Sequence, residues 1–208
     1  MTVGGQRATP PTARGRVTRE RIVRGAAALI YEHGVAGTSL DDVCRATSTS
    51  KSQLYHYFAD KSALVCAVID WQQDAVLTAQ QPYLGEFSTL AGLRAWRDNL
   101  VQANSTWVTF GGCPIGTLAS EVASDDPAGR HAAATAFEAW RSALSAGLQR
   151  IIDNGELPAS SDADSLALGL LAALQGGLLL SRTTQSAGPL AVSLDHALAA
   201  IDAERVAA

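Results

Sequence analysis

The chain has 208 residues, of which 47% are hydrophobic, and this composition predicts a folded protein with a sizeable core and excludes global disorder. The net charge of −4 does not by itself suggest a nucleic-acid partner, but the charge is unevenly distributed. Residues 1–64 contain nine Lys/Arg and five Asp/Glu, a net charge of +4, whereas residues 65–208 contain seven and fifteen, a net charge of −8. This asymmetry is typical of a polyanion-binding part joined to a non-binding part, although chance clustering on solvated surfaces would give the same counts.

The cysteine count argues against a metal site or a disulfide framework. Cys44, Cys66 and Cys113 form no CxxC pair and are odd in number, which fits a reducing cytoplasm. The N-terminal residues lack the apolar core of a signal peptide, and the most apolar stretch, Leu166–Leu180, is shorter than the about 20 residues that a membrane span needs. We therefore expect a cytoplasmic protein without a membrane segment, a metal or a cofactor.

The first predicted element is a basic arm, followed by a helix. Residues 1–17 are rich in Gly, Pro, Thr and Arg and have no hydrophobic period, which predicts a flexible segment. Apolar residues then recur at helical spacing, so a helix is expected from a cap at Thr18 to about His33, where Gly34 ends it.

Two short helices joined by a tight turn come next, which is the pattern of a helix-turn-helix motif. The first is capped by Thr38 or Ser39, and the second begins after Ser50. In such a motif the second helix enters the major groove of DNA. The residues expected to hold the two helices together are Leu40, Val43, Ala46, Leu54 and Phe58. The residues expected to offer hydrogen bonds and apolar contact to DNA are Ser50, Lys51, Ser52, Gln53, Tyr55 and His56.

The rest of the chain also reads as helical. Asp60 caps a long helix over about 61–83, and proline and glycine positions delimit the helices that follow. No alternating strand pattern occurs. The predicted fold class is therefore all-α, with nine helices, of which the last five lie at about 88–108, 114–124, 127–154, 162–186 and 190–205.

The segment at 54–64, LYHYFADKSAL, resembles the DNA-binding head of the TetR/AcrR family of bacterial regulators. That family has a tyrosine-rich recognition helix, then Phe, then Lys at the start of the next helix; the matching residues are Leu54, Tyr55, Tyr57, Phe58, Lys61 and Leu64. The resemblance implies a nine-helix TetR-like fold, with a DNA-binding domain over 18–64 and a ligand-binding and dimerisation domain over 65–208. In the turn, this chain has Ser48 and Thr49 where the family has Gly and a branched apolar residue. We expect strain of about 1 kcal/mol there, because serine does not adopt positive φ as cheaply as glycine does.

The resemblance also suggests roles for individual residues. Ser50, Lys51 and Gln53 are expected to face bases or nearby phosphates, while Tyr55 and His56 pack against the sugar-phosphate backbone. Tyr57 and Phe58 are expected to be core. Helix N-termini bind phosphate, so the remaining DNA-binding candidates at or near such ends are Thr38, Ser39 and Lys61, with Arg45 as an addition.

The segment Gly112–Glu121, GCPIGTLASE, resembles the GCPxGxLxxE signature of the LmrA/YxaF-like branch of this family. It implies a helical bundle that binds a small, mostly apolar effector, and a helix break that can pivot. The expected ligand-binding residues are Trp71, Trp107, Phe110, Cys113, Glu121, Phe137, Trp140 and Gln175. Alternatively, each aromatic residue packs in the core without contacting a ligand, and the helix break is only a tight connection between two helices.

The last two predicted helices, 162–186 and 190–205, carry leucine stripes that suit a homodimer interface. The stripes are Leu166, Leu170, Leu174 and Leu178 on one helix and Leu190, Leu194, Leu198 and Ile201 on the other. Alternatively, these leucine stripes pack only within the core of a single chain. The function expected is a ligand-responsive repressor that binds double-stranded DNA at a palindromic operator as a dimer.

Two other classes of function are compatible with parts of the sequence. One is a DNA-architectural protein without a ligand, which predicts weak sequence preference and no effector response. The other is a helical enzyme, but the four histidines and the acids show no HExxH motif and no paired-carboxylate spacing, so no catalytic residue is expected.

Overall fold

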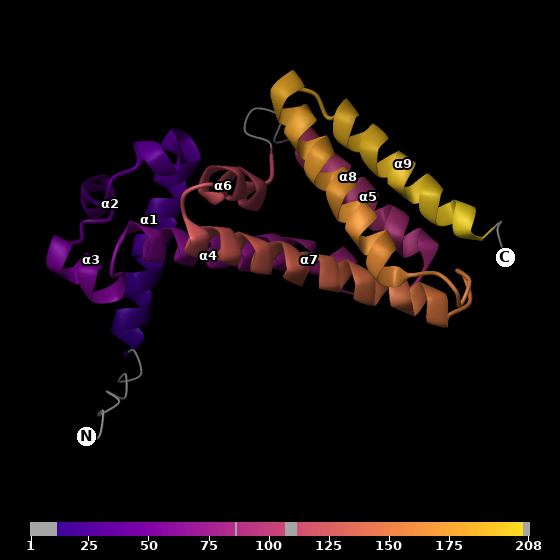
Figure 1. Ribbon diagram of the computed structural model, residues 1–208, viewed down its shortest axis with the longest axis horizontal. Coiled ribbons are helices and arrows are strands. Elements are labelled where there is room, and N and C mark those ends of the chain that lie inside the picture. The colour runs from indigo at the N-terminus through magenta and orange to yellow at the C-terminus, as the bar shows by residue number, and fades with distance from the viewer. Residues whose placement is uncertain (1–11, 86, 107–111, 206–208) are drawn as a thin grey trace. The chain divides into compact units, whose positions relative to one another are not determined.

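The computed structural model describes residues 12–85, 87–106 and 112–205, and within these ranges the chain forms nine α-helices and no strand (Figure 1). This confirms the all-α prediction. The chain divides into two compact units, Met1–Val68 and Ile69–Ala208, with helix α4 (Lys61–Leu84) contributing residues to both. The two units are described separately.

The first unit consists of α1 (Ala13–Gly37), α2 (Leu40–Ala46), α3 (Lys51–Tyr57) and the start of α4. One face of α1 supplies much of the core, and the short helices pack onto it through single apolar side chains. The fully or almost fully buried residues are Ile22, Val23, Ala26, Ala27, Ile30, Val43, Leu54, Phe58, Leu64 and Val65.

Helix α1 begins earlier than the sequence suggested. Its cap is Thr12, whose hydroxyl accepts a hydrogen bond from the Gly15 N–H at 3.1 Å, so the predicted cap at Thr18 was wrong. Residues 13–17 are therefore helical and do not belong to a flexible arm. Thr18 lies inside the helix and donates its hydroxyl to the Arg14 carbonyl at 3.0 Å. Gly34 has a φ of +74°, which breaks the helix where predicted, although one further turn follows.

The second unit contains the rest of α4 and five more helices. These are α5 (Leu90–Thr106), α6 (Pro114–Val122), α7 (Pro127–Asp153), α8 (Ala163–Thr184) and α9 (Gly188–Glu204). Each lies within two residues of its predicted bounds at both ends. Pro114 and Pro127 occupy the first helical turn, where the missing N–H removes no intrahelical hydrogen bond.

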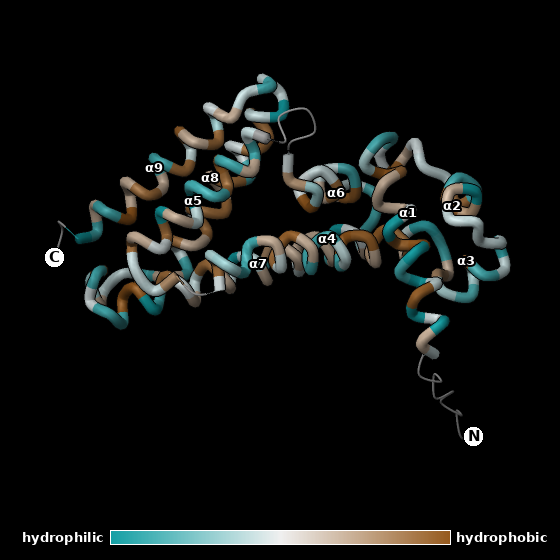
Figure 2. Tube along the Cα trace, turned by 180° about the vertical axis from the view of Figure 1, so that it is seen from behind, coloured by the Kyte–Doolittle hydropathy of each residue, from teal (hydrophilic) through white to brown (hydrophobic). Residues whose placement is uncertain are grey.

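Helix α8 lies between α7 and α9, and it packs most extensively with α9 (Figure 1). The two helices approach closely at Gly177, where an added Cβ would lie 2.9 Å from the Leu190 Cα. Ion pairs hold α5 to α9: Arg94 Nη2 lies 2.7 Å from Asp202 Oδ2, and Arg97 Nη2 lies 2.8 Å from Asp195 Oδ2. Figure 2 shows hydrophobic residues recurring among hydrophilic ones along these helices, as expected for helices with one buried face.

The leucine stripes of α8 and α9 serve the core of this unit. Leu170, Leu174, Leu190, Leu194 and Ile201 are at most 2% exposed within a single chain. The surface of the same two helices carries a different apolar set, all more than half exposed: Leu168, Leu179, Leu180 and Val192. Leu166 and Leu178 of the predicted stripes are partly exposed as well.

Helix α8 is the one helix of the described residues that is long and apolar enough to span a membrane by length and composition alone. It has 22 residues, so the expectation that this stretch is too short was wrong. The apolar stretch Leu166–Leu180 is only part of this helix, which begins after Asp162; the Asp162 side chain accepts hydrogen bonds from the N–H groups of Asp164 and Ser165. A core helix of a soluble bundle passes the same test, and α8 packs against two neighbours.

Candidate DNA-binding site and effector cavity

The turn between α2 and α3 is fixed by hydrogen bonds on both sides. The Thr47 hydroxyl donates to the Val43 carbonyl at 2.7 Å, and the Thr49 N–H donates to the Cys44 carbonyl at 3.0 Å. Arg21 of α1 donates to the Thr47 carbonyl. Ser48 has a φ of +50°, so the turn adopts the left-handed conformation that the family's glycine would favour, as the sequence predicted.

Helix α3 has one buried side and one exposed side. Leu54 is 0% and Phe58 3% exposed, and both anchor the helix to the core as predicted. Ala46 was expected to pack between the helices but is exposed; the neighbouring Thr47 is buried in its place, against Gly25 of α1. The opposite side of α3, which we call the recognition surface, consists of six exposed residues: Ser50, Lys51, Ser52, Gln53, Tyr55 and His56.

Gln53 has a structural role that the sequence reasoning missed. The Ser50 side chain accepts from the Gln53 N–H at 3.2 Å, and the Ser50 N–H donates to Gln53 Oε1 at 3.2 Å. These two bonds form a capping box, which the Ser-x-x-Gln spacing could have revealed. The Gln53 side-chain amide group therefore supports the start of α3 at the same position where it was expected to read a base.

Two basic residues of the motif are paired with acids at the start of α2. Lys51 Nζ lies 2.9 Å from Asp41 Oδ1, and this hydrogen bond raises the pKa of Lys51. Arg45 contacts Asp42, whose pKa is lowered chiefly by a hydrogen bond from the Ser39 side chain. Both pairs are exposed, so DNA phosphates can compete for the basic groups.

The residues expected at helix N-termini differ in their exposure to solvent. Thr38 is 3% exposed, and its hydroxyl donates to the Gly34 carbonyl at 2.8 Å, so it closes the end of α1 and does not face solvent. Ser39 is exposed and caps α2. Lys61 is half-buried at the first position of α4, next to Asp60, which accepts the Ala63 N–H at 2.8 Å.

The aromatic pair at the end of α3 packs inward. Tyr57 is partly buried, with its hydroxyl oxygen 3.5 Å from the position that a Cβ on Gly15 would take. The Arg19 guanidinium lies over the Phe58 ring, 5.3 Å from its centroid. Both residues therefore connect α3 to α1, in agreement with their expected core role.

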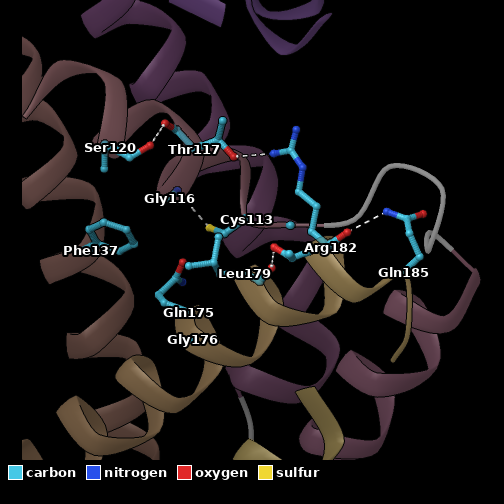
Figure 3. A pocket seen from close by; sticks show the side chains of 13 residues that line it. Cys113, Gly116, Thr117, Ser120, Phe137, Gln175, Gly176, Leu179, Arg182 and Gln185 are labelled. Carbon is cyan, nitrogen blue, oxygen red and sulfur yellow. Dashed lines mark hydrogen bonds between the residues drawn. The ribbon is translucent and has the colours of Figure 1, made fainter. Parts of the chain in front are cut away.

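The second unit contains a cavity of about 750 Å³ between α6, α7 and α8, which we call the effector cavity (Figure 3). It lies within the range of volumes typical of small-molecule sites. Figure 3 shows Cys113, Phe137 and Gln175 on one side of it and Arg182 reaching toward Thr117. The lining residues are Gly112, Cys113, Gly116, Thr117, Ala119, Ser120, Phe137, Gln175, Gly176, Leu179, Arg182, Thr183 and Gln185.

Three of the expected ligand-binding residues line this cavity, namely Cys113, Phe137 and Gln175. Trp71, Glu121 and Trp140 do not; Trp140 is a core residue, 2% exposed. Trp107 and Phe110 lie outside the described residues. On α8, Leu179 and Arg182 follow Gln175 by four and seven positions, so the helical period could have identified them from Gln175.

The GCPIGTLASE segment forms the wall of the effector cavity on the α6 side. Cys113 caps α6, with its Sγ accepting the Gly116 N–H at 3.3 Å, and burial raises the pKa of its thiol. Gly116 leaves room for Gln175, whose Oε1 would lie 2.8 Å from a Cβ added there. Gly112 has a φ of +124°, which favours glycine at this break before Pro114.

A helix-turn-helix with an exposed polar recognition helix, joined to a helical unit with a cavity of small-molecule size, is the architecture of a DNA-binding regulator. The comparisons with known proteins agree. Residues 22–68 match the model of the bacterial regulatory proteins of the tetR family, and residues 89–196 match the model of the C-terminal domain of LmrA/YxaF-like transcriptional regulators. The chain therefore belongs to the TetR family of transcriptional regulators, in its LmrA/YxaF-like branch.

Individual relatives extend over most of the chain. It is 29% identical to an HTH-type transcriptional regulator of Lactococcus lactis from the lacX 3' region, over 86% of this chain and 91% of the relative. It is 31% identical to an HTH-type transcriptional regulator of Mycobacterium tuberculosis, over 83% of this chain and 88% of the relative. A crystal structure of a TetR transcriptional regulator from Chloroflexus aurantiacus is similar, with a TM-score of 0.75, 29% identity, and coverage of 91% of this chain and 96% of that one.

Proposed function

We propose that this TetR-family regulator is a cytoplasmic repressor that binds a palindromic operator as a homodimer and is released by a small, mostly apolar effector. The observation that carries the DNA-binding part is the recognition surface. Six polar or aromatic side chains are exposed on a helix whose other side is anchored by Leu54 and Phe58. Such a helix presents hydrogen-bonding groups at a fixed angle, as reading a DNA groove requires.

The proposed DNA contacts follow from exposure. Lys51 and Gln53 are placed to reach bases or adjacent phosphates, and Ser39 and Lys61 to bind phosphates near the starts of α2 and α4. Arg45, Ser50, Ser52, Tyr55 and His56 remain candidates, since all five are exposed. Thr38 is left out of the proposed set because its hydroxyl is buried and already donates to α1.

The proposed dimer uses the exposed side of α8 and α9, within the predicted segments 162–186 and 190–205. Leu168, Leu180 and Val192 are each more than half exposed there. On α8, Gly169 has no atom within 4 Å of an added Cβ, so the backbone there is open to a close neighbour. A second copy of the same two helices would cover this apolar surface, which is costly to leave in water. This accounts for the apolar character of α8 without a membrane.

The effector cavity is the proposed site of release. A ligand that shifts the protein from mostly bound to mostly released must prefer the released conformation by about 5.5 kcal/mol for a full reversal of the two populations. The comparisons support regulation of transcription and not catalysis: the matched families and relatives are regulators. Within the described residues, no three His, Cys, Asp or Glu side chains gather in a way that could hold a metal ion.

The test begins with selection of binding sites from a random duplex library. We expect a sequence with twofold symmetry, and we expect affinity to fall sharply when about half a helical turn (about five base pairs) is inserted at its centre, because the half-sites then face opposite sides of the duplex. A full-turn insert serves as the control for added length. Selected sequences without symmetry, or affinity that ignores the insert, would instead support the architectural alternative.

A further inference from the structure

We propose that the effector cavity takes an organic anion, a carboxylate attached to a small aromatic or apolar body, with Arg182 as the group that binds the anionic oxygen. This inference rests on the proposed function, since it names the chemical class of ligand for the same cavity. It is argued from the charge, the partners and the shape of the lining.

The first observation is the charge of the lining. Among its thirteen residues, Arg182 is the one with a formal charge at neutral pH, and no Asp or Glu is present. This contrasts with the acidic balance of residues 65–208 as a whole. A cation in the wall with no acid beside it in the lining favours a ligand of opposite charge.

The second observation is what Arg182 contacts. Its Nη1 donates to the Thr117 hydroxyl at 3.1 Å, across the cavity from α8 to α6 (Figure 3). The ion pairs of the described residues involve Arg94, Arg97 and Arg141 of this unit but not Arg182. Arg182 is exposed, so its remaining guanidinium donors face solvent and are accessible to an acceptor from a ligand, and a carboxylate matches their fork geometry.

Arg182 also has a purely structural explanation. It lies in the last turn of α8, where a cation is favourable beside unpaired carbonyl groups. That role needs no particular direction of the side chain, whereas here the guanidinium crosses to α6 and is held by Thr117. The last-turn position and the ligand role are therefore compatible, and the experiment below separates them.

The remaining lining residues indicate the chemistry of the uncharged part of the ligand. Phe137, Leu179 and Ala119 offer apolar contact, and Gln175 Nε2 is shielded from solvent without a hydrogen-bond partner. The cap of α6 is the thiol of Cys113, a weaker acceptor than the usual hydroxyl or carboxylate, so the positive end of this helix is little compensated. An aromatic acid of modest size would contact Phe137 and satisfy Arg182 at the same time.

The experiment measures binding of matched probe pairs to the full-length protein by titration calorimetry. The pairs are benzoate with benzamide and cinnamate with cinnamamide, each with one carbon skeleton and nearly one shape. We expect the carboxylate of each pair to bind at least about tenfold more tightly, as for a charge-assisted hydrogen bond compared with a neutral one. In Arg182→Gln this ratio should fall to about one, and Arg182→Lys should restore part of it.

Arg130→Gln is the matched control, because Arg130 is an exposed arginine of the same unit that donates to the Ala123 carbonyl and does not line the cavity. Its carboxylate preference should equal that of the wild type. Equal binding of acid and amide, a preference that survives in Arg182→Gln, or no binding of either acid up to its solubility would overturn the proposal. Release of the selected operator is measured separately: a carboxylate that binds through Arg182 without releasing DNA contradicts the proposed function and leaves the ligand class standing.

Discussion

At the scale of single residues, Ser48 shows how the motif tolerates an unfavourable side chain. The turn between α2 and α3 requires positive φ, and Ser48 adopts +50°. For a residue with a Cβ, the left-handed conformation costs roughly 1–2 kcal/mol. The hydrogen bonds of Thr47 and Thr49 on either side hold the turn in this conformation in spite of that cost.

Ser48→Gly is expected to raise the free energy of unfolding by about 0.5–1 kcal/mol, because the relief of strain exceeds the entropy that glycine adds to the unfolded chain. Urea denaturation measures the change. Ser52→Gly, in the first turn of α3, is the control and should lower stability, because glycine adds entropy to the unfolded chain. If both variants lose stability equally, Ser48 is not strained.

Gln53 combines a structural and a proposed recognition role in one side chain, and substitution can separate the two. Gln53→Glu keeps the capping box, since Glu accepts the Ser50 N–H as Gln does, so stability should change by less than about 0.5 kcal/mol. The new carboxylate would face phosphates, so affinity for the selected operator should fall by about tenfold or more at low salt. Fluorescence anisotropy with labelled duplex measures this fall. Unchanged affinity would mean that Gln53 does not face DNA.

At the scale of elements, the starts of α2 and α3 are coupled through charge. Asp41 pairs with Lys51 across the two helices, while Asp42 pairs with Arg45 within α2. In the free protein the acids neutralise Lys51 and Arg45, two of the three basic groups that are proposed to meet DNA. DNA binding therefore requires exchange of a carboxylate partner for a phosphate, and this exchange lowers affinity for any duplex regardless of its sequence.

Asp41→Asn should strengthen binding to random duplex by about two- to fivefold at low salt, because an exposed ion pair worth roughly 0.2–1 kcal/mol no longer competes with DNA for Lys51. The measurement is a competition titration with unlabelled random duplex. Glu32→Gln removes the same charge from α1 without touching Lys51, and it should have a smaller effect. An equal gain in both variants would attribute the effect to net charge alone.

At the scale of the whole molecule, two units with different chemistry share one chain. The first unit is basic, with its polar recognition surface on a small core, and the second is acidic, with a cavity and an exposed apolar side on α8 and α9. In the proposed mechanism the second unit brings two copies of the first to one operator. Affinity for the operator then depends on the dimer as much as on any single contact.

Leu168→Glu is expected to convert the protein to a monomer, because it places a charge in the proposed interface without disturbing the core: Leu168 is 58% exposed. Sedimentation velocity measures the state of association, and circular dichroism should show unchanged helix content. Val17→Glu is the control, an equally large change at a 65% exposed residue of α1, and it should leave the dimer intact. A wild-type protein that sediments as a monomer would contradict the proposed interface.

The sequence by itself determined the helices and the motif. Caps such as Ser39 and Ser50 and breaks such as Gly34 act within a few residues of the chain, so their effects can be predicted locally, and the bounds of the later helices agree within two residues. The positive φ at Ser48 was also predictable, because Ser48 stands where the family that the motif resembles has glycine.

Only the tertiary structure decided which side chains are exposed and free to contact DNA, a ligand or a second chain. Thr38 is buried, Lys51 is paired with Asp41, and most residues of the leucine stripes of α8 and α9 are buried within one chain. It also separated Cys113, Phe137 and Gln175, which line the cavity, from Trp140, which does not, and brought Arg182 to Thr117. These outcomes depend on contacts between helices that are distant in sequence. The helical period predicts which residues share a face of a helix, but it does not predict which other helix covers that face.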